Sequence, residues 1–413
     1  MLAAHVAFLL TRHGSAPNQD ILQARSILAN NQAAKLIDGR YGTTYATVDA
    51  IIVAYVESAC GVTASSKGPF WVSPNGLSLE VHGIGNGGFD GGYGYNGMVL
   101  LVEAAKMLKD AGLETDAYHP VRDIALTAAH AFSNFIEPSV TTAGTSTLRR
   151  EEVLTFRKNF NVGEIGTAAS YIAAYDFADT NALHAFHLER LFGMSPPEWS
   201  NGNIDEGQNR MFRWGTAYLG LVQNAIDSAS GATVTDSSGV TFLHESAHAD
   251  GAWADPVAGA LSLKQDNQHA FIVLNWRPYG YGDASAYVKP DTVGALSNIA
   301  RLHFITPQAD RIVTAYLPTN VATGAATGFA SGAYGSQYVF HYGPYVAVLN
   351  LASTASSVTV PDIVGAISAY DWMTGTVYDL TKTRALPVPA NGGILLTIGS
   401  TPADAATASA LAF

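Results

Sequence analysis

The chain has 413 residues, of which 48% are hydrophobic and 14% charged, with a formal net charge of -12 and a pI of about 5.4. This length supports two or three domains with a buried core, and the composition is typical of a folded globular protein. The acidic balance argues against a nucleic-acid partner and an anionic membrane surface, although a local arginine cluster would still bind an acidic substrate. The single cysteine, Cys60, excludes a disulfide framework and a CxxC motif.

The apolar opening, residues 1–10, lacks a preceding basic region, so it predicts a helix rather than a signal peptide. We expect the chain to be a piece of a longer protein. No apolar run is long enough to span a membrane.

Up to about residue 230, apolar residues recur at helical spacing. Ile21, Ala24 and Ile27 fall on one stripe, with Pro17 as a start signal and Gly39 as a stop. The same reasoning predicts helices over 21–36, 44–59, 96–111, 119–136, 165–178 and 209–227. Three long loops, 61–95, 138–163 and 192–208, interrupt them, and loops of that length in a compact domain are functional or disordered.

After about residue 231 the period changes to two, and β-branched and aromatic runs alternate with turn residues. Strands are predicted over 270–276, 300–305, 311–316, 337–342, 345–350, 366–371, 376–380 and 393–398. Helices first and strands afterwards predict an α+β protein with segregated domains. The expected domains are a helical domain over 1–230 and an antiparallel β-sandwich over 231–413.

Residues 82–96 form the most unusual segment, because seven of the fifteen are glycine. Glycine contributes no packing side chain and loses backbone entropy on folding, so this segment suits neither a helix nor a strand interior. It is predicted to be a loop that delivers polar groups to a ligand and then runs into a helix. The candidate groups are His82, Tyr93, Tyr95 and Asn96; the alternative is a glycine-rich surface turn.

Two further polar segments, 155–161 and 201–214, resemble binding loops. In the second, Arg210, Arg213 and Trp214 occupy i, i+3 and i+4 of a predicted helix and so share a face. Arginine forks bind carboxylates and sulfates bidentately, and indole rings stack on sugars. The alternative is an ordinary solvated helix start.

Two short motifs point elsewhere. Arg12-His13-Gly14 resembles the histidine-phosphatase signature, but its alanine-rich helical flanks favour a chance tripeptide.

His244-Glu245-Ser-Ala-His248 is a literal H-E-x-x-H, which on a helix binds zinc and predicts a metallopeptidase. Its flanks favour a strand, on which the two histidines would lie about 13 Å apart, too far to share a metal. A structural metal at His244 and His248 and plain strand polarity are the other interpretations.

A helical domain followed by antiparallel sheets, with polar loops at helix ends, resembles the toroid-type polysaccharide lyases. The local match is His82-Gly, a glycine- and aromatic-rich loop, then Gly92-Tyr-Gly94 and an apolar helix, similar to the His…Tyr-Gly segment of the hyaluronate/chondroitin/xanthan lyase group. The closing pattern 342–350 and 369–376 also resembles the terminal sheets of carbohydrate-active enzymes. The resemblance implies an N-terminal incomplete (α/α) toroid of helix pairs followed by an antiparallel β-sandwich.

The resemblance also implies β-elimination at a uronic acid of an acidic polysaccharide. It makes Tyr93 or Tyr95 the base and acid, His82 an assisting base, and Asn96 or Asn159 the group that binds the carboxyl group. The substrate-binding residues it implies are Trp71, Phe89, Arg157, Asn159, Glu206, Arg210, Arg213 and Trp214. It implies no required cofactor, and this function suggests a secreted or periplasmic protein.

Two alternatives remain open at this point. A glycoside hydrolase on the same scaffold would need two carboxylates flanking the cleft, drawn from Asp90, Glu164, Asp205 and Glu206. A non-catalytic glycan-binding protein would use the same loops without turnover.

Overall fold

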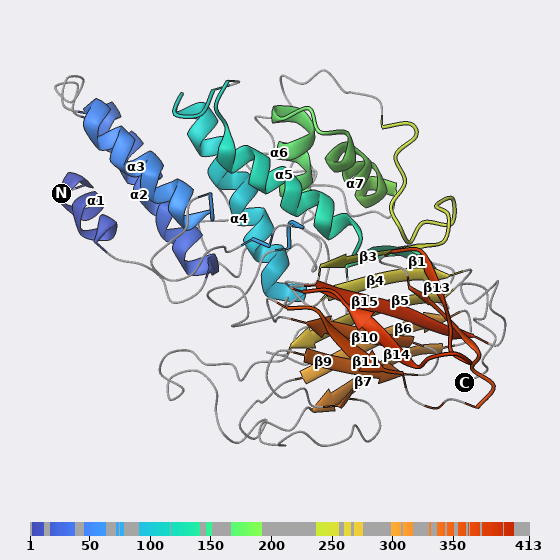
Figure 1. The fold of residues 1–413 in the computed structure, drawn as a ribbon. Coiled ribbons are helices and arrows are strands. Elements are labelled where there is room, and N and C mark those ends of the chain that lie inside the picture. Colours follow the sequence, from blue (N-terminus) through green and yellow to red (C-terminus); the bar gives the residue numbers. More distant parts are fainter. Residues whose placement is uncertain are drawn as a thin grey trace. The chain divides into compact units, whose positions relative to one another are not determined.

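Figure 1 shows the fold in a computed structural model, with helices and antiparallel sheets in one chain. The structure describes residues 2–11, 17–37, 45–62, 72–73, 75–77, 91–115, 117–140, 146–150, 167–191, 237–255, 260–265, 268–275, 299–306, 309–316, 330–331, 337–342, 345–350, 354–360, 362, 364–371, 374–390 and 392–399.

The chain divides into two compact units, which confirms the α+β class at the level of its elements. The described helices and the segment 237–245 belong to the first unit, and the strands from residue 251 onward belong to the second. Among the described residues, no helix has both the length and the apolar character needed to cross a membrane.

The first unit is helical apart from one hairpin. Its described helices are α1 (Leu2–Leu10), α2 (Pro17–Ile37), α3 (Tyr45–Ala59), α4 (Gly91–Asp110), α5 (Pro120–Ser133), α6 (Thr167–Asp176) and α7 (Thr180–Leu191). The helix predicted at the apolar opening corresponds to α1, and five of the other predicted helices correspond to α2 through α6. The predicted helix 209–227 lies outside the described residues. Helix α7 was not predicted.

A β-hairpin corrects the prediction for the region after α5. Residues 136–140 and 146–150 form the antiparallel strands β1 (Ile136–Val140) and β2 (Ser146–Arg150) instead of a helix end and a loop. Pro138 in β1 lacks a backbone N–H and fits only where that N–H is not needed, a position that an isolated strand pair offers.

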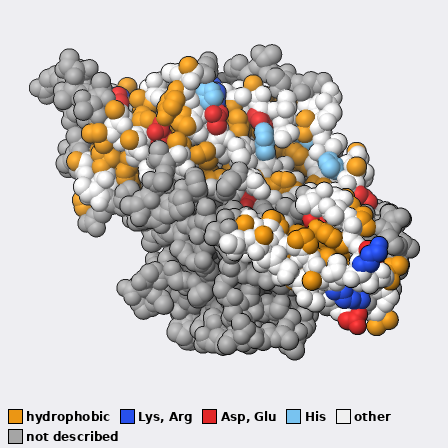
Figure 2. Space-filling view, viewed as in Figure 1, with side chains coloured by type: hydrophobic (Ala, Val, Ile, Leu, Met, Phe, Trp, Pro, Cys, Tyr) orange, Lys and Arg blue, Asp and Glu red, His pale blue; other side chains and the backbone are white. Residues whose placement is uncertain are grey.

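Helix α2 shows how local sequence and packing agree. Pro17 begins it, Asp20 lies in its first turn and Lys35 in its last, as the helix dipole favours. Its apolar stripe includes Ile21 and Ile27, both fully buried. Hydrophobic side chains also reach the surface over the helical elements (Figure 2).

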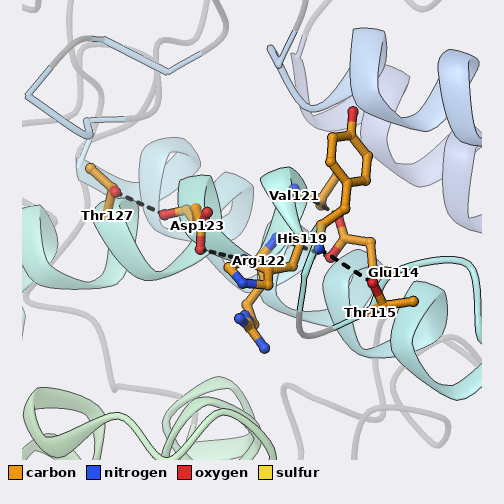
Figure 3. Close-up of polar contacts among 8 residues, drawn as sticks. Glu114, Thr115, His119, Val121, Arg122, Asp123 and Thr127 are labelled. Atoms are coloured by element: carbon orange, nitrogen blue, oxygen red, sulfur yellow. Dashed lines mark hydrogen bonds and ion pairs between the residues drawn. The ribbon is translucent and has the colours of Figure 1, made fainter.

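The N-terminus of α5 is capped by a residue from outside the helix. His119 stands at the N-cap but makes no side-chain capping bond. Glu114 supplies the acceptor instead: its Oε1 accepts from the N–H of Val121 at 2.7 Å and its Oε2 from the N–H of Arg122 at 3.4 Å (Figure 3). Burial raises the pKa of the Glu114 carboxyl, and the two backbone N–H groups oppose that shift.

We expect Glu114→Ala to lower the free energy of unfolding by about 1–3 kcal/mol, because two N–H groups at the start of α5 lose their acceptor. Glu114→Gln, whose amide oxygen can still accept one bond, should lose less. Urea denaturation at neutral pH measures both, and equal losses in the two variants would contradict the capping role.

A tight turn from Ser73 to Leu77 packs on α5. The Ser73 N–H donates to the carbonyl of Leu77 at 2.8 Å, and the Gly76 N–H donates back to the carbonyl of Ser73 at 2.9 Å. Gly76 has φ +103°, and a Cβ there would lie 2.5 Å from the Thr127 carbonyl oxygen of α5. Glycine is therefore required both by the backbone conformation and by the close approach of the helix.

Gly76→Ala should destabilise the first unit by more than about 2 kcal/mol, through positive-φ strain and a backbone clash together. Gly112→Ala is the matched control, since Gly112 has φ +66° but a Cβ added there would meet nothing within 4 Å. Thermal unfolding should show a smaller shift for the control, and equal shifts would show that the contact with Thr127 is unimportant.

The second unit consists of antiparallel sheets in the described residues. A five-stranded sheet has the order β3-β4-β5-β6-β7, from the strands β3 (Gly251–Asp255), β4 (Ala260–Gln265), β5 (Gln268–Asn275), β6 (Ile299–Thr306) and β7 (Ala309–Tyr316). A six-stranded sheet has the order β13-β12-β15-β10-β9-β8, from β8 (Ala330–Ser331), β9 (Gln337–Tyr342), β10 (Tyr345–Asn350), β12 (Ser368–Asp371), β13 (Thr376–Asp379) and β15 (Gly392–Gly399). Strands β11 (Ser356–Thr359) and β14 (Ala385–Val388) form a separate pair.

Each predicted strand corresponds to a strand of these sheets, whereas β3, β4, β8, β11 and β14 were not predicted. The second unit has a core that joins β10, β12 and β15 to the β11–β14 pair. Val346 and Leu396 lie opposite each other in register and both belong to this core, as does Leu386 of β14.

Asp371, at the end of β12, is fully buried. Its Oδ1 accepts from the N–H of Leu395 at 3.2 Å, and its Oδ2 accepts from the Thr374 hydroxyl at 2.7 Å. The carboxylate thus adds one hydrogen bond to β15 next to the last residue pair of β12 and β15. It also accepts a hydrogen bond from the turn that leads into β13.

Candidate functional site

The candidate site centres on helix α4, which packs against α2, α5 and α6. From Met98 to Leu108 its side chains are buried on nearly every side. A helix that is buried on nearly every side is an interior helix, so α4 is an interior element of the helical unit.

The predicted catalytic residues Tyr93, Tyr95 and Asn96 lie in the first turns of α4, and His82 lies outside the described residues. The prediction of a loop through residue 96 is wrong from Gly91 onward, because α4 begins there. Each glycine in a helix costs roughly 1 kcal/mol relative to alanine. Packing of the buried part of α4 offsets this cost, as tertiary contacts commonly override propensity.

The helix geometry separates these three positions. A helix turns by about 100° per residue, so Asn96 and Glu103 lie within about 20° of each other around the axis. By the same rule Tyr95 lies within about 20° of Lys106, and Tyr93 lies about 60° from Asn96 on the side away from Tyr95. Glu103 and Lys106 are themselves about 60° apart around the axis, so their contacts define two adjacent stripes of α4.

Glu103 faces α2. Its Oε1 contacts Nη2 of Arg25 in an ion pair, and the side chains are 2% and 12% exposed. Burial raises the pKa of Glu103 to about 7, while Arg25 acts in the opposite direction. Burial in the core thus outweighs the attraction of the guanidinium.

Lys106 faces α6. Its Nζ lies 3.2 Å from Oδ2 of Asp176, at the end of α6, and 3.1 Å from Oδ2 of Asp110 on α4 itself. Hydrogen bonds to the two carboxylates raise the pKa of Lys106, although burial alone would lower it. One helical turn on, Lys109 donates to the Asp176 carbonyl at 2.6 Å.

Glu103→Gln should change the pH dependence of stability. The folded pKa of Glu103 is raised from 4.5 to about 7, so the carboxyl group stabilises the folded state at low pH and loses that contribution as the pH rises through 7. The free energy of unfolding of the unmodified protein, relative to Glu103→Gln, should fall by up to about 3 kcal/mol between pH 4.5 and pH 7. Urea titrations at several pH values measure this, and a constant difference would refute it.

The remaining predicted binding residues lie outside the described residues. They are Trp71, Phe89, Arg157, Asn159, Glu206, Arg210, Arg213 and Trp214.

The H-E-x-x-H segment is not helical. Residues 241–250 form turns and bends, so the described backbone lacks the helix that would bring His244 and His248 to one metal. Glu245 has a different role: its Oε1 accepts from the N–H of Phe242 at 2.6 Å and contacts His184 Nε2 at 2.6 Å. Within the described part of the chain, no group of three or more His, Cys, Asp or Glu side chains could hold a metal ion.

Helix α7 brings together a histidine cluster that the sequence did not indicate. His184 pairs with Glu245 and stacks edge-on against Phe242 with ring centroids 4.8 Å apart. His187, one turn later, lies 2.9 Å from the Ser237 hydroxyl through its Nδ1. The two histidines thus attach the segment 237–245 to α7. Their spacing of three residues was visible in the sequence, but their partners lie 61 and 50 residues farther along the chain.

Cys60 is not a candidate nucleophile. Its side chain is fully buried, and burial together with the carboxylates of Glu114 and Glu57 raises its pKa well above the ordinary value. A thiol with a raised pKa has little thiolate and is inert.

No known protein family, curated protein sequence or solved structure matches the chain significantly.

Proposed function

We propose that the protein is a lyase that cleaves a uronic-acid-containing polysaccharide by β-elimination. The observation that carries the proposal is the start of α4 inside the glycine-rich segment, which puts Tyr93 and Asn96 one turn apart on the backbone at the N-terminal end of a buried helix. His82 precedes this helix in the same segment. In this proposal the helical unit is an incomplete (α/α) toroid and the second unit an antiparallel sandwich.

The chemistry needs a base, an acid and a group that neutralises the substrate carboxylate. The base, Tyr93 as phenolate, takes the proton from the carbon that bears the carboxyl group. The C–O bond to the leaving sugar then breaks at the neighbouring carbon, a C=C bond forms, and the tyrosine returns its proton to the leaving oxygen. Asn96 binds the carboxylate, and His82 assists the proton transfer.

The N-terminal end of α4 suits this chemistry. The first N–H groups of a helix have no partner within the helix, and the helix dipole favours negative charge at this end. Both effects favour a phenolate and the enolate-like charge that develops on the carboxyl group.

The helix geometry supports Tyr93 over Tyr95. Residues three apart on a helix are neighbours, as Tyr93 and Asn96 are, whereas adjacent residues such as Tyr95 and Asn96 do not face each other. Tyr95 shares instead the stripe of Lys106, which α6 covers farther along the helix.

Tyr93→Phe should lower kcat about 10²–10⁴-fold, because it removes the base and acid but little of the substrate contact. Tyr95→Phe is the matched control and should stay within a few-fold of the unmodified protein. Turnover is followed by the ultraviolet absorbance of the unsaturated product on a panel of acidic polysaccharides.

New reducing ends that form without a rise in that absorbance would indicate hydrolysis and refute elimination. Binding of glycans with neither product would indicate a non-catalytic protein. An equal loss of kcat in Tyr93→Phe and Tyr95→Phe would refute the assignment of Tyr93 as the base and acid.

A further inference from the structure

Helix α2 carries a second stripe without charge on the side opposite its buried face. The helix packs against α1, α3 and α4, and its buried side chains occupy an arc of about 140° around the axis. A surface helix ordinarily places charged and polar residues on the opposite side. Here that side, within an arc of about 80°, consists of Leu22, Ser26, Ala29, Ala33 and Leu36.

The large side chains of this outer stripe are open to solvent. Leu22 is 39% exposed and Leu36 is 87% exposed, and Ile37 beside them is 77% exposed. Ile51 on the neighbouring helix α3 is 51% exposed as well. Figure 2 shows hydrophobic side chains gathered over α2 and α3. A contiguous exposed apolar surface of this kind marks an interaction site more often than isolated exposed residues do.

The spacing of the outer stripe is that of a coiled-coil seam. From Leu22 to Leu36 its consecutive members are alternately four and three residues apart. This is the a/d pattern of the seven-residue repeat, through which two helices pack along their length. The stripe extends over about 21 Å of helix. Contact with solvent does not require such a repeat, so the pattern indicates a helical partner.

The polar side chains on this side of α2 are already hydrogen-bonded within the helix. The Ser26 hydroxyl donates to the carbonyl of Leu22 at 3.0 Å. The Asn30 amide, beside the stripe, donates to the carbonyl of Ser26 at 2.7 Å. Covering a polar group is costly when it leaves a donor unsatisfied. A partner helix can therefore cover Ser26 and keep its donor satisfied.

The sizes of the side chains make the stripe complementary to a second copy of itself in the antiparallel direction. Each a position then faces a d position, so Leu22 of one copy lies opposite Ala33 of the second copy. In the next layer Ser26 lies opposite Ala29, so large side chains meet small ones. A parallel pair would place Leu22 against Leu22 and Ala29 against Ala29, which leaves gaps between the leucines.

We propose that two copies of the chain associate through the outer stripe of α2, with the two α2 helices antiparallel. Such an interface is isologous, because the same surface serves both copies. Its lack of charge suits self-association of a chain with a net charge of -12, whose copies repel each other elsewhere. The antiparallel direction also brings opposite ends of the two helix dipoles together.

Sedimentation equilibrium tests the association. Between about 1 µM and about 200 µM, the weight-average mass of the unmodified protein should rise toward twice the mass of one chain, since a two-helix interface is at the weak end of the range. Ala29→Arg should stay monomeric over this range, because the pair would bury its charge without a partner. Leu36→Glu provides a second variant with the same expected result.

Thr127→Arg, at an exposed position of α5, is the matched control and should associate like the unmodified protein. Ala29 and Leu36 are exposed, so all three variants should keep the unfolding midpoint of the unmodified protein at concentrations where it is monomeric. An unmodified protein that stays monomeric would overturn the proposal. So would Ala29→Arg and Leu36→Glu proteins that associate as tightly as the control.

Cysteine cross-linking tests the direction of the pair. A mixture of Leu22→Cys and Ala33→Cys proteins should form covalent dimers at least about tenfold faster than either variant alone, because only facing positions reach disulfide geometry. Cys60 is fully buried and does not compete. Faster cross-linking of Leu22→Cys with itself would refute the antiparallel pair. The absence of covalent dimers in all three samples would refute the outer stripe as the interface. None of these readouts depends on the proposed function.

Discussion

The burial of helix α4 is the constraint on which the helical unit depends. A helix surrounded by α2, α5 and α6 can carry charged side chains only if each has a partner, because an isolated buried charge is expensive. Glu103 finds Arg25 on α2, and Lys106 finds Asp176 at the end of α6. The charges of α4 therefore connect it to two of its neighbours.

Buried polar groups need hydrogen-bond partners, and the same requirement accounts for contacts between segments elsewhere in the described chain. Glu114 accepts the first N–H groups of α5 in place of an ordinary N-cap. Glu57, on α3, accepts from the Tyr118 hydroxyl at 2.9 Å and so ties the segment before α5 to α3. In the second unit the Asp371 carboxylate accepts a hydrogen bond from the backbone N–H of Leu395. In each case a carboxylate links segments that are separated in the sequence.

The role of the glycine-rich segment, residues 82–96, depends on helix α4, which begins within it. A loop would only carry the polar groups, but with α4 beginning at Gly91 the two tyrosines and Asn96 belong to a helix of fixed geometry. A helix end combines a rigid frame with unpaired N–H groups and a favourable dipole, which suits chemistry that generates negative charge. Glycines at 91, 92 and 94 add no side-chain bulk to this end of the helix, so that a ligand could approach the backbone closely.

The sequence by itself determined the class and most of the elements. The helical stripes of α2 to α6 and the period-two runs of β5 to β7, β9, β10, β12, β13 and β15 could be recognised because each depends on local spacing. The short strands β11 and β14 carry too few residues for a period to show. Helix α7 could have been recognised, because its buried residues Leu183 and Phe186 are three apart. Only the tertiary structure decided that Glu103 meets Arg25, that Glu245 meets His184, and that Gly91 to Asn96 are helical. These outcomes depend on contacts between residues far apart in the chain, and such contacts leave no periodic signal in the sequence.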